Sequence, residues 1–520
     1  MRSELNRREF IKVLGSLPLL KLAVDLAPSA SMETSQQEAI GPNILVIVFD
    51  ALSATNVSLY GYPRLTTPNF SRFAEKATVF NRHYAGGSFT SPGTASVLTG
   101  TYPWTNRAFH LYGTVAPDFE ERNLFHSFAE DNYHRMVFTH NDLAAMLLYQ
   151  FGDDIEQHKK TKELCRFSEY FLADDFFPGD HNAAFLGERT ITRGQRGQDL
   201  QLPSTVYASA LHRVWRTYGK QKQRAEFKKS FPRGLPSTNA GPIQYLLEDA
   251  TDWVKYQVSH APQPFLGYFH FLPPHEPYNP HKDFINIYSD EWQPVPKPQH
   301  FFTQKYSDAD LNGKRKNYDE YIAYADAEFG KLLDHMEKTG LIDNTVLVVT
   351  SDHGEMFERG ILEHITPTLY EPITRVPLVI SRPGQGERID VDMPTSCTDL
   401  LPTLLHAAGK SVPDWVDGQI LPTFSDEVIE SERSVYTVEA KSNPKPSPLR
   451  KGTIAMVKDR YKLIYYFGYE GYDEQYEMYD LLNDPEELEN LYSESNATAG
   501  EMKAELHAKI VQVDEPYSRR

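Results

Sequence analysis

A run of apolar residues that stops at two potential metal ligands is the feature that most constrains the fold of this chain. Residues 345–350 read Thr-Val-Leu-Val-Val-Thr, which predicts a strand buried on both faces of a parallel sheet. Asp352 and His353 follow, and Gly354 permits a sharp turn away. Because ligands of open α/β sheets bind outside the carboxyl ends of the strands, we expect both side chains at such an edge. Alone, the pattern is equally typical of a turn that caps the next segment.

A second strand of the same design makes a ligand site the better interpretation. Residues 43–49 form another apolar run, and this run ends on Asp50. Two buried strands that deliver carboxylates to one edge of a sheet indicate a site for a cation.

A predicted helix start lies in residues 88–100. Thr90 or Ser91 suits the N-cap position, and Pro92 suits the first turn. Such a start directs free N–H groups and the positive end of the helix dipole at a ligand. A threonine hydroxyl activated there by a cation could attack an anionic ester. From composition alone, the simpler interpretation is that Thr90 only caps the helix.

The order of the remaining elements predicts an α/β fold: a large, mostly parallel sheet sandwiched by helices, with a smaller C-terminal α+β subdomain. We expect a signal segment at 1–40, a catalytic domain at 41–425 and the subdomain, with antiparallel strands and a terminal helix, at 426–520. Residues 155–240 have the least regular pattern and are interpreted as an insertion over the site. Helices are expected at 70–76, 317–338, 395–408 and 500–513, and strands at 78–84, 264–272, 435–438, 453–457 and 461–467. Residues 123–150 are expected to form a helix, a strand at 134–139 and a second helix.

Two further histidines are candidates for contact with a substrate. His275 follows the predicted strand 264–272 and lies between prolines, a position that favours function over a structural role. His364 and Arg375 precede another strand, and for them the two interpretations are balanced. His270 lies inside a strand, so we expect it in the core or behind the ligands.

The N-terminus carries an export pattern. Asn6-Arg-Arg-Glu-Phe-Ile-Lys12, followed by a short apolar run, resembles a twin-arginine signal, which predicts a periplasmic or extracellular protein. A charged N-terminal helix of a cytoplasmic protein is the alternative. We expect no transmembrane segment in the mature chain.

The net charge excludes one class of partner. A formal charge of −18 argues against general nucleic-acid binding. A negative protein that acts on an anionic ester needs local positive charge, most simply a metal. The two cysteines, Cys165 and Cys397, cannot form a disulfide framework, and Cys397 is expected in the core.

A series of spaced motifs extends along most of the chain. They are Asp50 with Tyr60-Gly-Tyr62, Thr67-Pro-Asn69, Pro92 with Ala95 to Gly100, His270 to Tyr278, Asp343 to Glu355, Leu369-Tyr-Glu371, Arg375 to Leu378, Arg460 to Ile464 and Met478 to Pro485. Taken together, these stretches resemble the sulfatase family of the alkaline phosphatase superfamily, from Asn43 to about Tyr492. The resemblance implies the fold predicted above and hydrolysis of anionic esters.

The departures from the family pattern bear on the chemistry. Sulfatases have a cysteine or serine two residues before the motif proline, which is oxidised to formylglycine, and an arginine two residues after it. Here these positions are Thr90 and Thr94, and a frequent second acid is Ala51. Threonine cannot give that aldehyde. The remaining set is similar to single-metal, threonine-nucleophile members such as lipoteichoic acid synthases.

This resemblance implies one divalent cation held by Asp50, Thr90, Asp352 and His353. Two carboxylates, a hydroxyl and an imidazole suit manganese, magnesium or calcium, and zinc is an alternative. Thr90 would be the nucleophile, with His275 and His364 at the anionic group. We expect hydrolysis or transfer of phosphate esters in preference to sulfate esters. The alternatives are a sulfuric ester hydrolase that works without formylglycine, and a non-catalytic family member that binds an anionic ligand.

Overall fold

The central strand of the molecule is β1 (Asn43–Phe49), and every one of its residues is buried. The computed structural model describes residues 41–130, 132–168, 218, 225–238, 243–425, 433–472 and 474–518. The predicted signal segment and residues 169–217, 219–224 and 239–240 of the predicted insertion therefore lie outside the described residues. The described residues belong to one compact unit.

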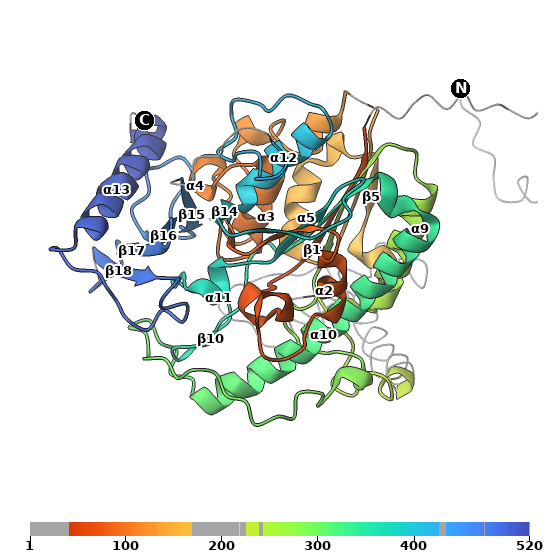
Figure 1. The fold of residues 1–520 in the computed structure, drawn as a ribbon, viewed down its shortest axis with the longest axis horizontal. Helices are drawn as coiled ribbons and strands as arrows, with labels where there is room; N and C mark the ends of the chain where they lie inside the picture. Colours follow the sequence, from red (N-terminus) through yellow and green to blue (C-terminus); the bar gives the residue numbers. More distant parts are fainter. Residues whose placement is uncertain are drawn as a thin grey trace, which may run out of the picture. The chain divides into compact units, whose positions relative to one another are not determined.

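The strand β1 lies in the middle of an eight-stranded sheet with the order β13-β2-β12-β9-β1-β8-β4-β5 (Figure 1). The five strands from β9 to β5 run parallel, and β12 is antiparallel to both of its neighbours. The sheet is thus mostly parallel, as the sequence predicted. Its strands are β13 (Ile389–Val391), β2 (Thr78–Phe80), β12 (Leu378–Ser381), β9 (Thr345–Thr350), β8 (Phe265–Phe271), β4 (His134–Thr139) and β5 (Gln157–Lys159).

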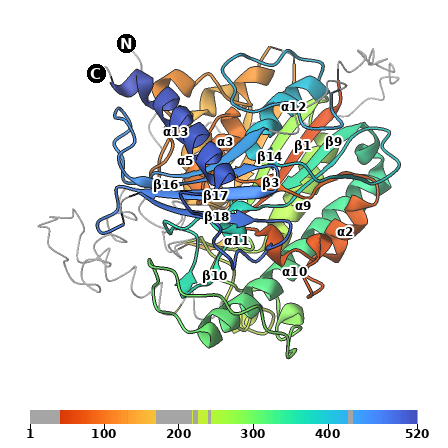
Figure 2. The same ribbon diagram turned by 60° about the vertical axis from the view of Figure 1, so that its left-hand side comes forward.

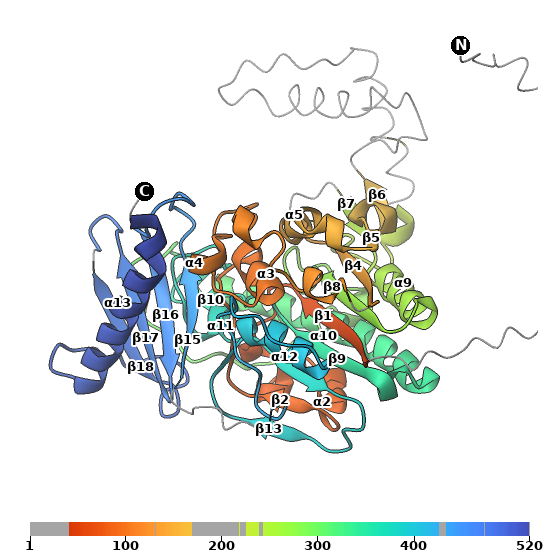
Figure 3. The ribbon, with the colours of Figure 1, turned by 90° about the horizontal axis from the view of Figure 1, so that it is seen from above.

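Helices cover both faces of this sheet because the side chains of β1 alternate between two cores. Leu45, Ile47 and Phe49 belong to one core, and Ile44, Val46 and Val48 belong to the other. The first core is completed by α2 (Pro68–Ala74), α9 (Leu247–His260) and α10 (Asp308–Thr339). The second is completed by α3 (Thr90–Thr99), α5 (Asp142–Gln150) and α12 (Leu400–Ala407). Figure 1 shows α3, α5 and α12 above the strands and α2 and α10 below them, and Figure 3 looks onto the layer that contains α3 and α12.

A second, antiparallel sheet is formed by the C-terminal part of the chain. Its strands are β15 (Ser434–Glu439), β16 (Gly452–Lys458), β17 (Tyr461–Phe467) and β18 (Gln475–Asp480), and α13 (Ala497–Ser518) packs on it (Figure 2). Tyr102 precedes α4 (Pro103–Asn106), and Trp104 lies in it. Both side chains belong to the apolar cluster formed by the second sheet and α13. Buried Lys462 of β17 forms an ion pair at 3.1 Å with Glu371, which lies in the short helix before β12.

Further short elements lie outside the two large sheets. They are the paired strands β3 (His83–Tyr84) with β14 (Thr395–Ser396), β10 (Phe357–Glu358) with β11 (Ile361–Leu362), and β6 (Cys165–Ser168) with β7 (Ile243–Tyr245), together with the short helix α11 (Glu371–Thr374). Within the described part of the chain, no helix is long and apolar enough to cross a membrane.

Three expected elements differ in the structure. The strand expected at 78–84 is divided between β2 and β3, which belong to different sheets, because the chain turns at 81–82. The helix expected at 395–408 begins only at Leu400, since Thr395 and Ser396 pair with β3. The helix expected before 134 is replaced by 3₁₀ turns, such as His126–Phe128. Cys397 is fully buried, in the core as expected.

Candidate functional site

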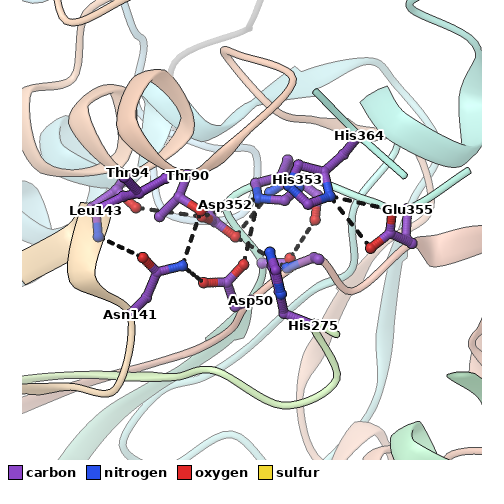
Figure 4. A network of polar contacts seen from close by, with 12 residues as sticks. Asp50, Thr90, Thr94, Asn141, Leu143, His275, Asp352, His353, Glu355 and His364 are labelled. Carbon is purple, nitrogen blue, oxygen red and sulfur yellow. Dashed lines mark hydrogen bonds and ion pairs between the residues drawn. The ribbon is translucent and has the colours of Figure 1, made fainter. Parts of the chain in front are cut away.

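Three adjacent strands deliver three potential metal ligands to one edge of the main sheet. Asp50 follows β1, His270 lies near the end of β8, and Asp352 follows β9, and β1 lies between the other two strands. The Asp50 N–H donates to Phe271 O at 2.9 Å, which holds the end of β1 against β8. One side-chain atom of each of Asp50, His270 and Asp352 lies within 4.8 Å of the others, and all three residues are buried. The predicted convergence of the strand ends is therefore present (Figure 4).

His353 and Thr90 complete this cluster. His353 Nε2 lies 3.4 Å from Asp50 Oδ1, 3.6 Å from Asp352 Oδ2 and 3.3 Å from Thr90 Oγ1. The other ring nitrogen, Nδ1, lies 2.9 Å from the carbonyl oxygen of Gly354, so Nδ1–H donates and Nε2 faces the acids. The structure thus brings together all four residues that the sequence proposed as metal ligands.

The position of Thr90 corrects one detail of the expected helix start. The N-cap of α3 is Phe89, which has no capping side chain, and Thr90 and Ser91 are already helical. The Thr90 hydroxyl therefore does not cap the helix. It faces His353 and Asn141 instead. This removes the simpler interpretation of Thr90.

The first turn of α3 packs directly against the loop that carries Asp352. A Cβ atom on Gly93 would lie 2.3 Å from Asp352 O, so only glycine permits this approach. Thr94 Oγ1 donates to Asp352 Oδ2 at 3.4 Å. The position where the family pattern has an arginine is thus filled by a hydroxyl that contacts a candidate ligand.

Three imidazoles lie side by side at the site. The ring of His364 lies 4.3 Å from that of His353 and 4.9 Å from that of His275, measured between centroids. His275 Nδ1–H donates to Glu276 O at 2.8 Å, and His364 Nδ1–H donates to the buried Glu355 carboxylate at 3.2 Å. In both rings Nε2 is therefore the nitrogen left for a ligand. Both predicted histidines lie at the site.

Arg375 does not take part in this arrangement. Its guanidinium donates to Asn81 O at 3.0 and 2.7 Å and has a structural role. Two groups that sequence reasoning did not select do belong to the site. They are Asn141, which donates to Thr90 and Asp50, and Glu355, which holds His364. For Glu355 a signal existed, because it follows the Asp-His-Gly turn within the same motif.

Comparison with known proteins identifies the family. The profile described as Sulfatase matches residues 42–410. The chain belongs to the sulfatase family. A second profile, described as the C-terminal part of N-sulphoglucosamine sulphohydrolase, matches residues 366–516 of this sulfatase-family chain.

Curated relatives and solved structures agree with this assignment. An arylsulfatase of Clostridium perfringens is 24% identical over 486 residues, covering 86% of this chain and 90% of that protein. An uncharacterised sulfatase of Escherichia coli is 25% identical over 470 residues, covering 86% and 83%. The structure of the phosphonate monoester hydrolase of Agrobacterium radiobacter superposes with a TM-score of 0.63 at 18% identity, covering 92% and 96%. The protein is an ester hydrolase with the sulfatase fold.

In this sulfatase-family site, burial and the contacts between acids and imidazoles shift the pKa values of both kinds of group. Burial alone would raise the pKa of Asp50, but the adjacent imidazoles of His270 and His353 lower it well below its usual value. Burial, together with the charge of Asp50, raises the pKa of Asp352. Burial would lower the pKa of His353, but the two acids raise it to about 9. Two buried carboxylates thus draw positive charge to this point.

The donor set fits a divalent cation. Asp50 Oδ1 is buried and makes no hydrogen bond within the described residues, although a buried carboxylate oxygen normally has a partner. Carboxylate oxygens, imidazole nitrogens and a hydroxyl surround it, and together they form a ligand set that suits a divalent cation. Tyr268 Oη lies 3.2 Å from His270 Nδ1, a contact that orients His270 Nε2 toward the acids.

Proposed function

We propose that this sulfatase-family protein is a cation-dependent hydrolase of phosphate and sulfate esters that uses unmodified Thr90 as its nucleophile and favours phosphate. The observation that carries the proposal is the place of Thr90 Oγ1, 3.3 Å from His353 Nε2 at the first turn of α3. There it lies among the candidate ligands with no capping role. One divalent cation would be held by Asp50, Asp352, His353 and Thr90, with His270 as a fifth donor. When bound, it supplies Lewis-acid charge that eases loss of the Thr90 proton and offsets negative charge on the ester.

The reaction then follows from the residues around Thr90. The hydroxyl proton passes to solvent, and the Thr90 oxygen attacks the phosphorus or sulfur atom. The bond to the ester oxygen breaks, and its electron pair stays on that oxygen. His275, which carries a second proton at Nε2, gives that proton to the leaving oxygen, and His364 lies beside His275 at the anionic group. Water then attacks the threonine ester, which releases phosphate or sulfate and restores the hydroxyl.

The preference for phosphate follows from the groups that stabilise the non-bridging oxygens of the ester. With Thr94 in place of an arginine, stabilisation of the non-bridging oxygens falls to the cation, the helix-start N–H groups and the imidazoles. A phosphate monoester has more negative charge on those oxygens than a sulfate ester, so a cation attracts it more strongly. The Agrobacterium neighbour is named for phosphonate monoester hydrolysis, a related phosphorus chemistry.

Hydrolysis of sulfate esters by direct attack of Thr90 is the second candidate. The Clostridium relative is named an arylsulfatase, and this name favours the alternative. Kinetics on nitrophenyl phosphate and nitrophenyl sulfate separate the two. A higher kcat/KM for the phosphate is expected, and a higher value for the sulfate would contradict the proposed preference.

The nucleophile is tested separately. We expect a phosphothreonine in the peptide that contains Thr90 when a phosphate ester is turned over and the reaction is quenched in acid. Thr90→Ala should abolish both the adduct and turnover, whereas Thr90→Ser, which keeps a hydroxyl, should retain part of the activity. Full activity of Thr90→Ala would exclude this mechanism.

We also propose that residues 1–40 are an export signal, that residues 41–425 form the catalytic domain and that residues 426–520 form the C-terminal subdomain. The N-terminal sequence of the mature protein, compared between cytoplasmic and exported fractions, tests export. Retention of residues 1–40 in a cytoplasmic protein would contradict it.

A further inference from the structure

The side chain of Asn141 caps α5 and also contacts Thr90, the candidate nucleophile in α3. It follows β4 at the same edge of the sheet as Asp50 and is fully buried. Its side-chain oxygen accepts hydrogen bonds from the N–H groups of Leu143 at 2.7 Å and Ala144 at 3.4 Å, as the N-cap of α5. Its backbone N–H donates to Thr139 Oγ1 at 2.9 Å. The residue is thus held at both ends.

The cap determines which way the amide points. Backbone N–H groups only donate, so the atom that faces Leu143 and Ala144 must be the oxygen. The amide nitrogen therefore faces the site, where it donates to Thr90 Oγ1 at 3.1 Å and to Asp50 Oδ2. An amide nitrogen carries two hydrogens, and both are used (Figure 4).

We propose that Asn141 is a catalytic residue of the reaction described above: its N–H aims the Thr90 oxygen and stabilises the negative charge on it before attack. The inference rests on the proposed function, because it requires Thr90 to be the nucleophile. Its physical basis is that a donor fixed in advance stabilises developing charge without reorganisation. A hydroxyl that accepts from Asn141 must also direct its own hydrogen elsewhere, so the amide sets the orientation of the lone pairs of Thr90.

The identity of residue 94 explains why a neutral donor such as Asn141 is needed. Thr94 contacts Asp352 and supplies no positive charge to the nucleophile. His353 Nε2 faces the two acids as well as Thr90. Within the described residues, Asn141 is therefore the neutral N–H donor that contacts the Thr90 oxygen.

Capping and catalysis can be separated by substitution. Serine is also a strong N-cap, but its hydroxyl is too short to cap α5 and donate to Thr90 together. Asn141→Ser should therefore keep a near-native melting temperature and lose ~10²-fold in kcat, as expected on removal of one such donor. Asn141→Ala should lose as much kcat and in addition melt at a lower temperature. Asn141→Asp keeps the cap and the shape but replaces the donor by an acceptor, so its loss should be the largest.

Three measurements accompany the kinetics: bound metal, inhibition by inorganic phosphate, and the rate at which phosphothreonine forms in a single turnover. The proposal requires slower phosphothreonine formation by Asn141→Ser with metal content and phosphate affinity retained. Wild-type kcat in Asn141→Ser, or a loss fully explained by missing metal, would overturn it. Thr90→Ala distinguishes failure of the role proposed for Asn141 from failure of the proposed function. If Thr90→Ala is inactive while Asn141→Ser is fully active, only the role of Asn141 fails, whereas an active Thr90→Ala removes the proposed function itself.

Discussion

Substitution of Gly93 by alanine should separate the nucleophile from the ligand loop. The added Cβ would lie 2.3 Å from Asp352 O, 2.9 Å from its carbonyl carbon and 3.3 Å from its Cβ. Ordinary contact begins near 3.4 Å, so α3 and this loop must move apart by about 1 Å. Both clashing groups are backbone or close to it, and neither can rotate away. Misplacement of reacting groups by about 1 Å costs ~10²-fold in rate, and overpacking costs about 1–3 kcal/mol of stability.

The assay is kcat/KM on nitrophenyl phosphate together with metal content and the melting temperature. Two variants serve as controls. Gly418→Ala places a Cβ 2.0 Å from Thr398 O, a comparable backbone clash away from the site. It should lower stability but leave kcat/KM of the folded protein unchanged. Gly313→Ala, in α10 with open space around its Cβ, should be neutral or stabilising. Wild-type kcat/KM in Gly93→Ala would show that the approach of α3 to Asp352 does not set the geometry of catalysis.

The remaining predictions concern the cation, the nucleophile and acid stability. A chelator should abolish activity and manganese should restore it; activity that survives with no metal bound would contradict this. His270→Ala should weaken cation binding by about 10–100-fold by titration, and unchanged affinity would place His270 outside the ligand set. Thr90→Ala should lower kcat by at least ~10³-fold. Burial lowers the pKa of His83, His140 and His300 to about 3, so each takes up a proton on unfolding below pH 6.5. The contribution of these three histidines to stability should therefore fall as the pH falls below 6.5. A triple variant with neutral residues at these positions should lose less melting temperature on acidification than the wild type, and an equal loss would refute this.

The sequence predicted the main sheet and much of the site because both depend on local patterns. The strands that end on Asp50 and Asp352 are continuous apolar runs, and such runs followed by acids point to the carboxyl edge of a parallel sheet. The placement of Thr90 beside His353 came from the family resemblance, and the structure brings the two together.

What the sequence could not predict are contacts that depend on register and on helix ends. His270 lies inside β8, where alternation alone allows either face, and its pairing level with Val48 brings Nε2 3.1 Å from Asp50. Asn141 follows a strand that carries no motif, and only the adjacent α5 fixes its amide. The exact start of α3 also escaped prediction, because Thr90 and Ser91 both suit a cap, whereas the N-cap is the apolar Phe89.

The distance along the chain between the site's components has a consequence for when the site exists. Thr90 and His353 are 263 positions apart, and β9, which leads to His353, lies between β1 and β12. A fragment that ends before Thr345 contains Asp50 and Thr90 but neither ligand of the Asp-His turn. The full ligand set forms only when β9 has joined the sheet, so a cation would bind here only after the main sheet has folded. Its binding energy would then oppose unfolding of the whole sheet rather than of any single segment.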